Sequence, residues 1–226
     1  MEFTVEYRNR RSFELRVEPP GIVKVVAPQN AREAEVLELV ESKAQWINQK
    51  LSKIRELESR RCKREYKDGE GFLYLGRNWP LEVVLERGIA KPFVSLDGGS
   101  LRIVSDRLDK EQLRAVLEKW YRQRAAEKIK ERLRHYSTII GVEPNAVRIK
   151  NQKKRWGSCS SRGNLNFNWR CIMAPIEVLD YIVVHELCHL VHMNHSSKYW
   201  ALVGRIMPDY QNHRDWLRLN GISMEL

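Results

Sequence analysis

The chain has 226 residues, 42% of them hydrophobic, which is enough to form a core in one large or two small domains. Its 40 lysines and arginines outnumber its 29 aspartates and glutamates, and a net charge of +11 favours contact with acidic or phosphorylated groups. There is no apolar run of the roughly 20 residues that a membrane span needs, no apolar signal segment at the N-terminus and no paired cysteine spacing, so we expect a cytoplasmic protein without a membrane partner.

Residues 1–106 are predicted to form a β-rich N-terminal region with one long helix. Alternating apolar and polar residues predict three strands, at residues 3–7, 13–17 and 22–26. A turn at Pro19-Pro20-Gly21 precedes the third strand, and a helix over 31–61 with Asn30 as its cap follows it. Four further strands are predicted, at residues 72–75, 81–86, 93–96 and 101–104. The Asp-Gly-Gly-Ser sequence at 97–100 indicates a hairpin between the last two.

Residues 107–226 are predicted to form a second domain that begins with a helix over about 109–140. A strand at 147–150, a small-residue turn at 155–163 and a second strand at Asn164–Arg170 follow. Strict alternation places the apolar side chains of this last strand on one face and the amides of Asn166 and Asn168 on the other. A helix with Pro175 in its first turn comes next, and it is apolar on several sides, so we expect it to be buried.

Four of the six histidines lie in the segment 185–195, which contains an H-E-x-x-H motif. On a helix, His185 and His189 lie one turn apart on the same face, where two imidazoles can share one tetrahedral zinc ion. Glu186, next to the first ligand, is placed to accept a proton from a metal-bound water. The motif therefore predicts a metal site with its catalytic base built in.

His195 is the favoured third ligand, because Glu225 is the only glutamate after Glu186 and lies next to the C-terminus. A continuous helix would point His195 away from the other two histidines, so the helix must break before it. Asn194 tolerates a left-handed turn and is the expected break, with Ser196 or Ser197 capping a new helix. Asp209 and Asp215 are candidates to accept the second N–H of the ligand imidazoles and so to orient them.

Three segments together resemble the YgjP-like family of metal-dependent hydrolases: Arg155–Cys159, Leu179–His189, and Asn194–Ser196 followed by Tyr199-Trp200. The likeness spans essentially the whole chain and is strongest from Lys150 to Trp216. Tyr199 departs modestly from the pattern, because another aromatic, often phenylalanine, is expected there.

The resemblance implies an α+β protein whose C-terminal part is a zincin-like domain, related to SprT-like and WLM metallopeptidases. Such a domain would combine a small antiparallel sheet with an active-site helix that bears the H-E-x-x-H motif. The matching positions imply that His185, His189 and His195 bind the metal and that Glu186 is catalytic. Zinc is the expected cofactor, although imidazole also accepts other divalent transition metals.

The leading interpretation is hydrolysis of a peptide or protein substrate by a zinc-bound water that Glu186 activates. The strand Asn164–Arg170, with Asn166 and Asn168, could hold an extended peptide by adding it to the edge of the sheet. Three further residues are candidates to stabilise the oxyanion: Arg155, Tyr210 and His213.

Two other interpretations remain open at the level of the sequence. The first keeps the metal but makes the substrate a nucleoside triphosphate, an activity also attached to the YgjP-like group, with phosphate bound by Lys153, Lys154 and Arg155. No Gly-rich phosphate loop supports it. The second is a nucleic-acid-associated module with a structural metal. The basic charge favours this interpretation, but no recognised nucleic-acid-binding motif supports it. The sequence indicates no oligomeric state.

Overall fold

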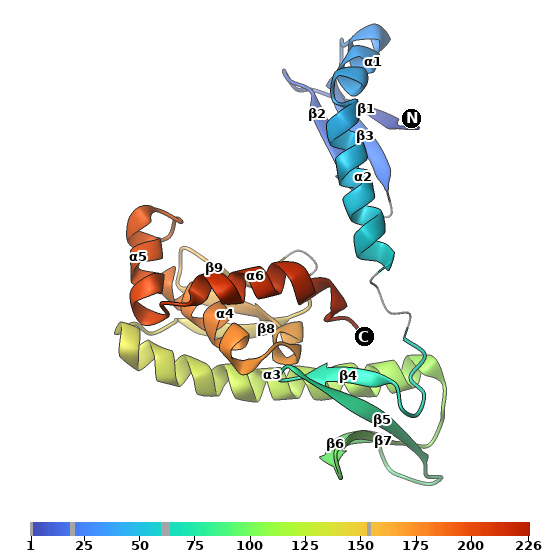
Figure 1. Cartoon of the computed structure of the whole chain (residues 1–226), viewed down its shortest axis with the longest axis vertical. Helices are drawn as coiled ribbons and strands as arrows, with labels where there is room; N and C mark the ends of the chain where they lie inside the picture. Colours follow the sequence, from blue (N-terminus) through green and yellow to red (C-terminus); the bar gives the residue numbers. More distant parts are fainter. Residues whose placement is uncertain (1, 19–20, 60–63, 153–154) are drawn as a thin grey trace. The chain divides into compact units, whose positions relative to one another are not determined.

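The computed structural model describes residues 2–18, 21–59, 64–152 and 155–226, and it divides into two compact units, 1–62 and 63–226. Helices and strands occur in both units, which confirms the predicted α+β class (Figure 1). The four strands that the sequence analysis grouped with the N-terminal region belong to the second unit. Within the described residues, no helix has both the length and the apolar character that crossing a membrane requires.

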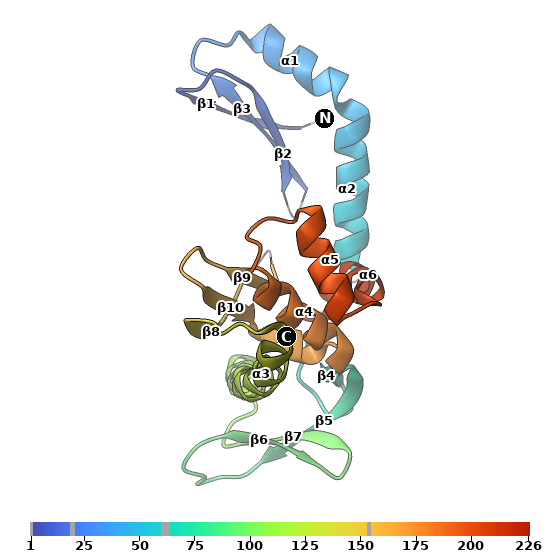
Figure 2. The same cartoon turned by 90° about the vertical axis from the view of Figure 1, so that its left-hand side faces the viewer.

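The first unit begins with a three-stranded sheet. Its strands are β1 (Thr4–Arg8), β2 (Glu14–Glu18) and β3 (Ile22–Pro28). β3 is central, parallel to β1 and antiparallel to β2 (Figure 2). This central position explains the nearly continuous apolar sequence of β3, in which Val23, Val25 and Ala27 are buried. The three strands agree with the sequence prediction, whereas the Pro19-Pro20 part of the turn lies outside the described residues.

The prediction of one long helix over 31–61 was wrong, because this segment forms two helices. α1 (Glu33–Ser42) ends at Lys43, and α2 (Ala44–Ser59) begins directly after it. The bend allows Val36 and Val40 of α1 and Ile47 of α2 to bury their side chains in one cluster with the sheet. The N-cap of α1 is Arg32 rather than Asn30, because the Glu35 carboxylate accepts a hydrogen bond from the Arg32 backbone N–H at 2.8 Å.

The second unit opens with a four-stranded sheet and a long helix. The strands are β4 (Gly71–Tyr74), β5 (Arg77–Leu85), β6 (Phe93–Asp97) and β7 (Ser100–Ser105), in the order β4-β5-β7-β6. β6 and β7 form the predicted hairpin. α3 (Lys110–Ile140) follows, with the Asp109 side chain accepting a hydrogen bond from the Gln112 backbone N–H at 2.9 Å. Because α3 packs against β6 and β7, this sheet forms part of the second unit.

A smaller three-stranded sheet lies beyond α3, and it differs from the predicted antiparallel sheet. Its strands are β8 (Ala146–Lys150), β9 (Gly157–Cys159) and β10 (Asn164–Asn168). β10 is central, antiparallel to β9 but parallel to β8, so the sheet is mixed. β9 falls in the segment predicted as a turn. Trp169 and Arg170 were predicted to continue the strand, but they begin the 3-10 helix η1 (Trp169–Met173), which the Asn168 side chain caps.

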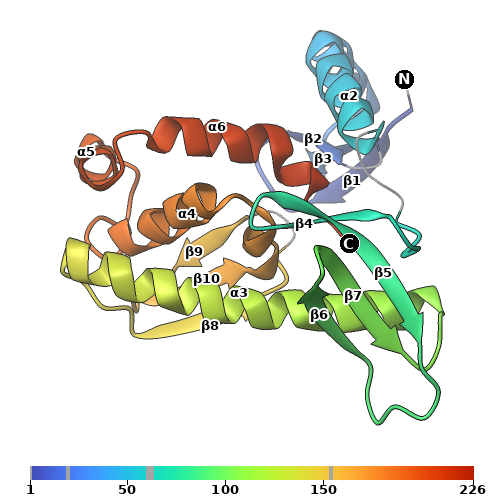
Figure 3. The same ribbon diagram turned by 60° about the horizontal axis from the view of Figure 1, so that its bottom comes forward.

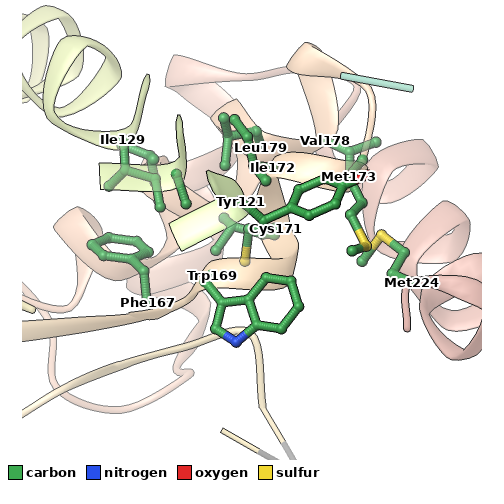
Figure 4. Close-up of a cluster of buried hydrophobic side chains, with 14 of the residues drawn as sticks. Tyr121, Ile129, Phe167, Trp169, Cys171, Ile172, Met173, Val178, Leu179 and Met224 are labelled. Carbon is green, nitrogen blue, oxygen red and sulfur yellow. The ribbon is translucent and has the colours of Figure 1, made fainter. Parts of the chain in front are cut away.

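Three helices and a final turn complete the unit: α4 (Ile176–Cys188), α5 (Ser197–Ile206), α6 (Tyr210–Asn220) and η2 (Gly221–Ser223). α4 packs against α3, α5, α6 and β9, and Figure 3 shows it between α3 and α6. One hydrophobic core joins these elements to the four-stranded sheet. Figure 4 shows Tyr121 and Ile129 of α3 in a cluster with Phe167, Trp169 and Leu179. The motif helix is therefore buried, as predicted.

Candidate metal centre

α4 is held against α3 by a buried ionic contact. Asp180 of α4 is 7% exposed, and its two carboxylate oxygens accept hydrogen bonds from Nε and Nη2 of Arg132 at 2.6 and 2.8 Å. The Tyr136 hydroxyl donates a third hydrogen bond to Asp180 at 3.1 Å. Such a two-pronged contact fixes the rotation of one helix on the other. The direction in which the histidine side chains of α4 point is fixed with it.

The ligand nitrogens of His185, His189 and His195 all lie within 4.8 Å of one another. Nε2 of His185 and Nε2 of His195 are 3.3 Å apart. Two nitrogens bound at about 2.0–2.1 Å to a tetrahedral zinc would be separated by roughly 3.3–3.4 Å, so this pair has the spacing that zinc requires. Burial, together with a smaller contribution from the two neighbouring histidines, lowers the pKa of His185 to about 3. The imidazole is therefore neutral, which is the form that binds a metal.

The chain turns sharply between the second and third histidines. α4 ends at Cys188, and His189 is its C-terminal cap, so the helix stops earlier than the predicted break at Asn194. Among the described non-glycine residues only Tyr66 and Leu75 have a positive φ, so the left-handed conformation expected at Asn194 does not occur. Ser196 caps α5 as predicted, by accepting a hydrogen bond from the Tyr199 backbone N–H.

Two aromatic residues at the start of α5 support the histidines. The Tyr199 hydroxyl donates a hydrogen bond to the His185 carbonyl oxygen at 3.0 Å, and its ring stacks on His189 with centroids 4.6 Å apart. Trp200 stacks on His195 with centroids 5.5 Å apart. The sequence analysis predicted only a helix here, because a stacking partner on a second helix leaves no periodic signal.

One backbone oxygen, and neither of the two predicted carboxylates, contacts a ligand imidazole. Nδ1 of His189 lies 3.1 Å from the His192 carbonyl oxygen, which leaves Nε2 of His189 for a metal. Nδ1 of His185 is buried without a hydrogen-bond partner among the described residues. Asp209 and Asp215 have other contacts, to His213 at 3.1 Å and to Arg218 at 3.4 Å.

Glu186 is 4% exposed, and its Oε2 atom has no hydrogen-bond partner among the described residues. Burial raises the pKa of Glu186 to about 8, and the positive charge of Arg155 partly opposes this shift. Gly157 of β9 provides the room for the carboxylate, because a Cβ atom added there would lie 2.4 Å from Glu186 Oε1. The carboxylate therefore packs against the backbone of Gly157, where no side chain occupies the space.

His185 and Glu186 line a pocket of about 330 Å³. Arg155, predicted as an oxyanion-stabilising residue, and Gly157 border it from the β9 side. Arg214 and Arg218 of α6 border the same pocket. The sequence analysis missed both α6 arginines, although their spacing of four residues places them on one face of a helix.

The two predicted amides of β10 form hydrogen bonds within the protein. Nδ2 of Asn166 donates to Ser158 Oγ at 3.2 Å. Nδ2 of Asn168 donates to the Gln152 carbonyl oxygen at 2.8 Å, and Asn168 is 3% exposed. Neither lines the pocket. The prediction that their strand adds a peptide at the sheet edge was wrong, because β10 is central and pairs with a strand on each side.

Tyr210 and His213 of α6 do not line the pocket with Glu186 either. The Tyr210 ring stacks on Trp200 with centroids 5.3 Å apart, and it therefore supports the ring that stacks on His195. Nε2 of His213 lies 3.1 Å from Asp209. Lys153 and Lys154, predicted as phosphate ligands, lie outside the described residues.

Comparisons with known proteins identify one family. Residues 11–220 match the family model described as YgjP-like, metallopeptidase domain. Among solved structures, the chain is similar to the crystal structure of the metallopeptidase zymogen of Pyrococcus abyssi abylysin, at 26% sequence identity over 41% of this chain and 92% of that chain, with a TM-score of 0.37. No curated protein matches the chain.

Proposed function

The chain belongs to the YgjP-like family of metallopeptidase domains and is a metal-dependent hydrolase, and we propose that it is a zinc peptidase in which Glu186 is the catalytic base. One observation carries this proposal: three imidazoles converge within 4.8 Å, and one of them, His185, lines a pocket with a buried carboxylate, Glu186, whose Oε2 has no partner among the described residues. A site that only stabilised the fold would have no use for that carboxylate.

The donor set fits zinc, because three imidazoles suit a borderline-soft divalent cation and leave a fourth position open. His185, His189 and His195 would hold the ion. When bound there, zinc would polarise the target carbonyl and lower the pKa of a coordinated water toward about 7.

Glu186 would accept a proton from the attacking water and return it to the leaving amine. The carboxylate is placed for both steps, since it borders the pocket next to His185 and Oε2 is not engaged by another described residue. Tyr199 and Trp200 would keep the imidazoles in place by stacking on them. Arg155, also in this pocket, would add positive charge near the developing oxyanion.

The position of β9 supports a peptide substrate. Among the described strands, β9 pairs only with β10, so its other edge has backbone groups free to pair with an extended chain. Gly157, the first residue of β9, lies against Glu186 and borders the pocket. A peptide added along β9 would therefore pass the histidines with its backbone held in register.

Replacement of one carboxylate tests the mechanism. Glu186→Gln should lower kcat by about 10²- to 10⁴-fold, because the base is lost, while the zinc content stays at the wild-type level. Glu177→Gln is the matched control, because Glu177 lies on the same helix, is exposed and does not line the pocket. Zinc would be measured by mass spectrometry after purification without chelators, and turnover by cleavage of a peptide library.

The same preparation would also be assayed for hydrolysis of a panel of nucleoside triphosphates. Release of phosphate or pyrophosphate without any peptide cleavage would show that the peptidase assignment is wrong. Full peptide cleavage by Glu186→Gln would remove Glu186 from the mechanism but leave the substrate class intact.

A further inference from the structure

The pocket beside Glu186 contains more positive charge than the proposed reaction uses. Arg155 borders it from the segment that leads into β9, whereas Arg214 and Arg218 border it from α6. Glu186 is the single carboxylate among the described residues that line this pocket. Three guanidinium groups therefore share the pocket with one carboxylate, and that carboxylate is already assigned to proton transfer.

Two of the three arginines, Arg155 and Arg214, form no ion pair with a carboxylate within the described part of the chain. Arg214 instead lies over the Trp200 ring, with the guanidinium carbon 5.6 Å from the ring centroid. A cation held by its face on an aromatic ring can still donate hydrogen bonds from its edge.

The third arginine has a partner that it can exchange. Nη2 of Arg218 lies 3.4 Å from Asp215, and the two side chains are 72% and 53% exposed. Exposed ion pairs of this kind contribute little free energy, so a ligand carboxylate could replace Asp215 at small cost. Arg214 and Arg218 are four residues apart on α6, one above the other on a single face.

Apolar side chains form the remaining walls of the pocket. Tyr181 and Leu217 are buried, and Trp156 packs against the core. Walls of low polarity focus the field of the charges at the rim. A carboxylate that enters would meet two guanidinium groups there, each of which can donate two hydrogen bonds to it.

We propose that Arg214 and Arg218 form a carboxylate-binding subsite that selects substrates with an acidic group close to the bond that is cleaved. This proposal rests on the proposed peptidase function and names the substrate class. The acidic group is a carboxylate, which a peptide can supply from an Asp or Glu side chain or from its own C-terminus. Because the subsite shares its pocket with His185 and Glu186, the acidic group and the scissile bond are near neighbours.

Binding can be tested without turnover, by titrating zinc-loaded Glu186→Gln protein with matched peptides in a calorimeter. The probes are acetylated alanine pentapeptide amides with Glu or Gln at one position in turn, and the unsubstituted pentapeptide with a free or an amidated C-terminus. We expect at least one Glu peptide, or the free C-terminus, to bind about tenfold more tightly than its neutral partner. Which probe shows this preference identifies the source of the carboxylate.

Variants of α6 then assign the preference to the two arginines. Arg214→Ala and Arg218→Ala should each reduce the ratio of acidic to neutral binding severalfold, and Arg214→Glu should reverse the preference toward a Lys peptide. Arg162→Ala is the matched control, because it removes one exposed arginine that does not line the pocket. Arg155 is left unchanged in this test because the proposed function already assigns its charge to the developing oxyanion.

The outcomes separate this proposal from the proposed function. Equal binding of acidic and neutral peptides, or a preference that survives both alanine variants and Arg214→Glu, would overturn the subsite. A preference that depends on the α6 arginines, found in a protein that cleaves no peptide, would keep the subsite and reject the peptidase. Cleavage of peptides with no preference for acidic residues would keep the peptidase and reject the subsite.

Discussion

The carboxylate of Glu186 occupies space that exists because residue 157 has no side chain. A Cβ atom at Gly157 would lie 2.4, 2.6 and 2.7 Å from Oε1, Cγ and Cδ of Glu186. Glu186 is 4% exposed, so its side chain has little room in which to move aside. The sequence analysis placed Gly157 in a turn. No sequence pattern shows that a glycine is opposite a catalytic carboxylate, because the two residues meet only through the packing of α4 on β9.

Gly157→Ala should therefore displace the carboxylate while the three histidines stay in place. We expect kcat to fall by about 100-fold with unchanged zinc content, since a shift of about 1 Å in a reacting group can cost that much. Gly204→Ala is the control, because its added Cβ would meet the Tyr210 ring at 3.6 Å, an ordinary contact. Wild-type turnover by Gly157→Ala would show that the position of Glu186 is not critical.

At the scale of elements, the orientation of α4 depends on the contact between Asp180 and the α3 residues Arg132 and Tyr136. The pKa of Arg132 is raised chiefly by its hydrogen bond with Asp180. Both helices were predicted from the sequence, yet their pairing was not, because 48 residues separate the two partners. A carboxylate buried in an otherwise apolar helix is the signal that indicates such a partner.

Asp180→Asn should destabilise the second unit by about 3 kcal/mol, at the lower end for a broken buried pair because the Arg132 side chain is 22% exposed. Glu127→Gln, which breaks an exposed pair with Arg124 within α3, should cost less than about 1 kcal/mol. Urea unfolding followed by tryptophan fluorescence would measure both. Equal stabilities for the two variants would contradict a role for Asp180 in holding α4.

At the scale of the whole molecule, the core of the second unit spans both of its sheets. Phe72, Leu81 and Leu101 from the four-stranded sheet share one buried cluster with Phe167 and the helices. The Tyr121 hydroxyl of α3 donates a hydrogen bond to the Leu73 carbonyl oxygen at 2.7 Å. The predicted domain boundary after residue 106 would cut through this cluster, whereas a boundary near residue 62 would leave it whole.

Two fragments distinguish these boundaries. We expect residues 63–226 to unfold in one cooperative thermal transition and to bind zinc, and residues 107–226 to lack such a transition because they lose one wall of the core. Circular dichroism and metal analysis would measure both properties. Cooperative folding of 107–226 with zinc bound would instead support the boundary after residue 106.

The sequence by itself determined the features that depend on local spacing: the strands of the first unit, the long helix α3, and the histidine motif with its adjacent glutamate. Each follows from the period of a helix or a strand, which is a property of neighbouring residues. Tertiary structure alone decided that β9 is the open edge, that Gly157 accommodates Glu186 and that two arginines of α6 share a pocket with Arg155. Those contacts join segments separated by tens of residues, and only the packing of the core brings such segments together.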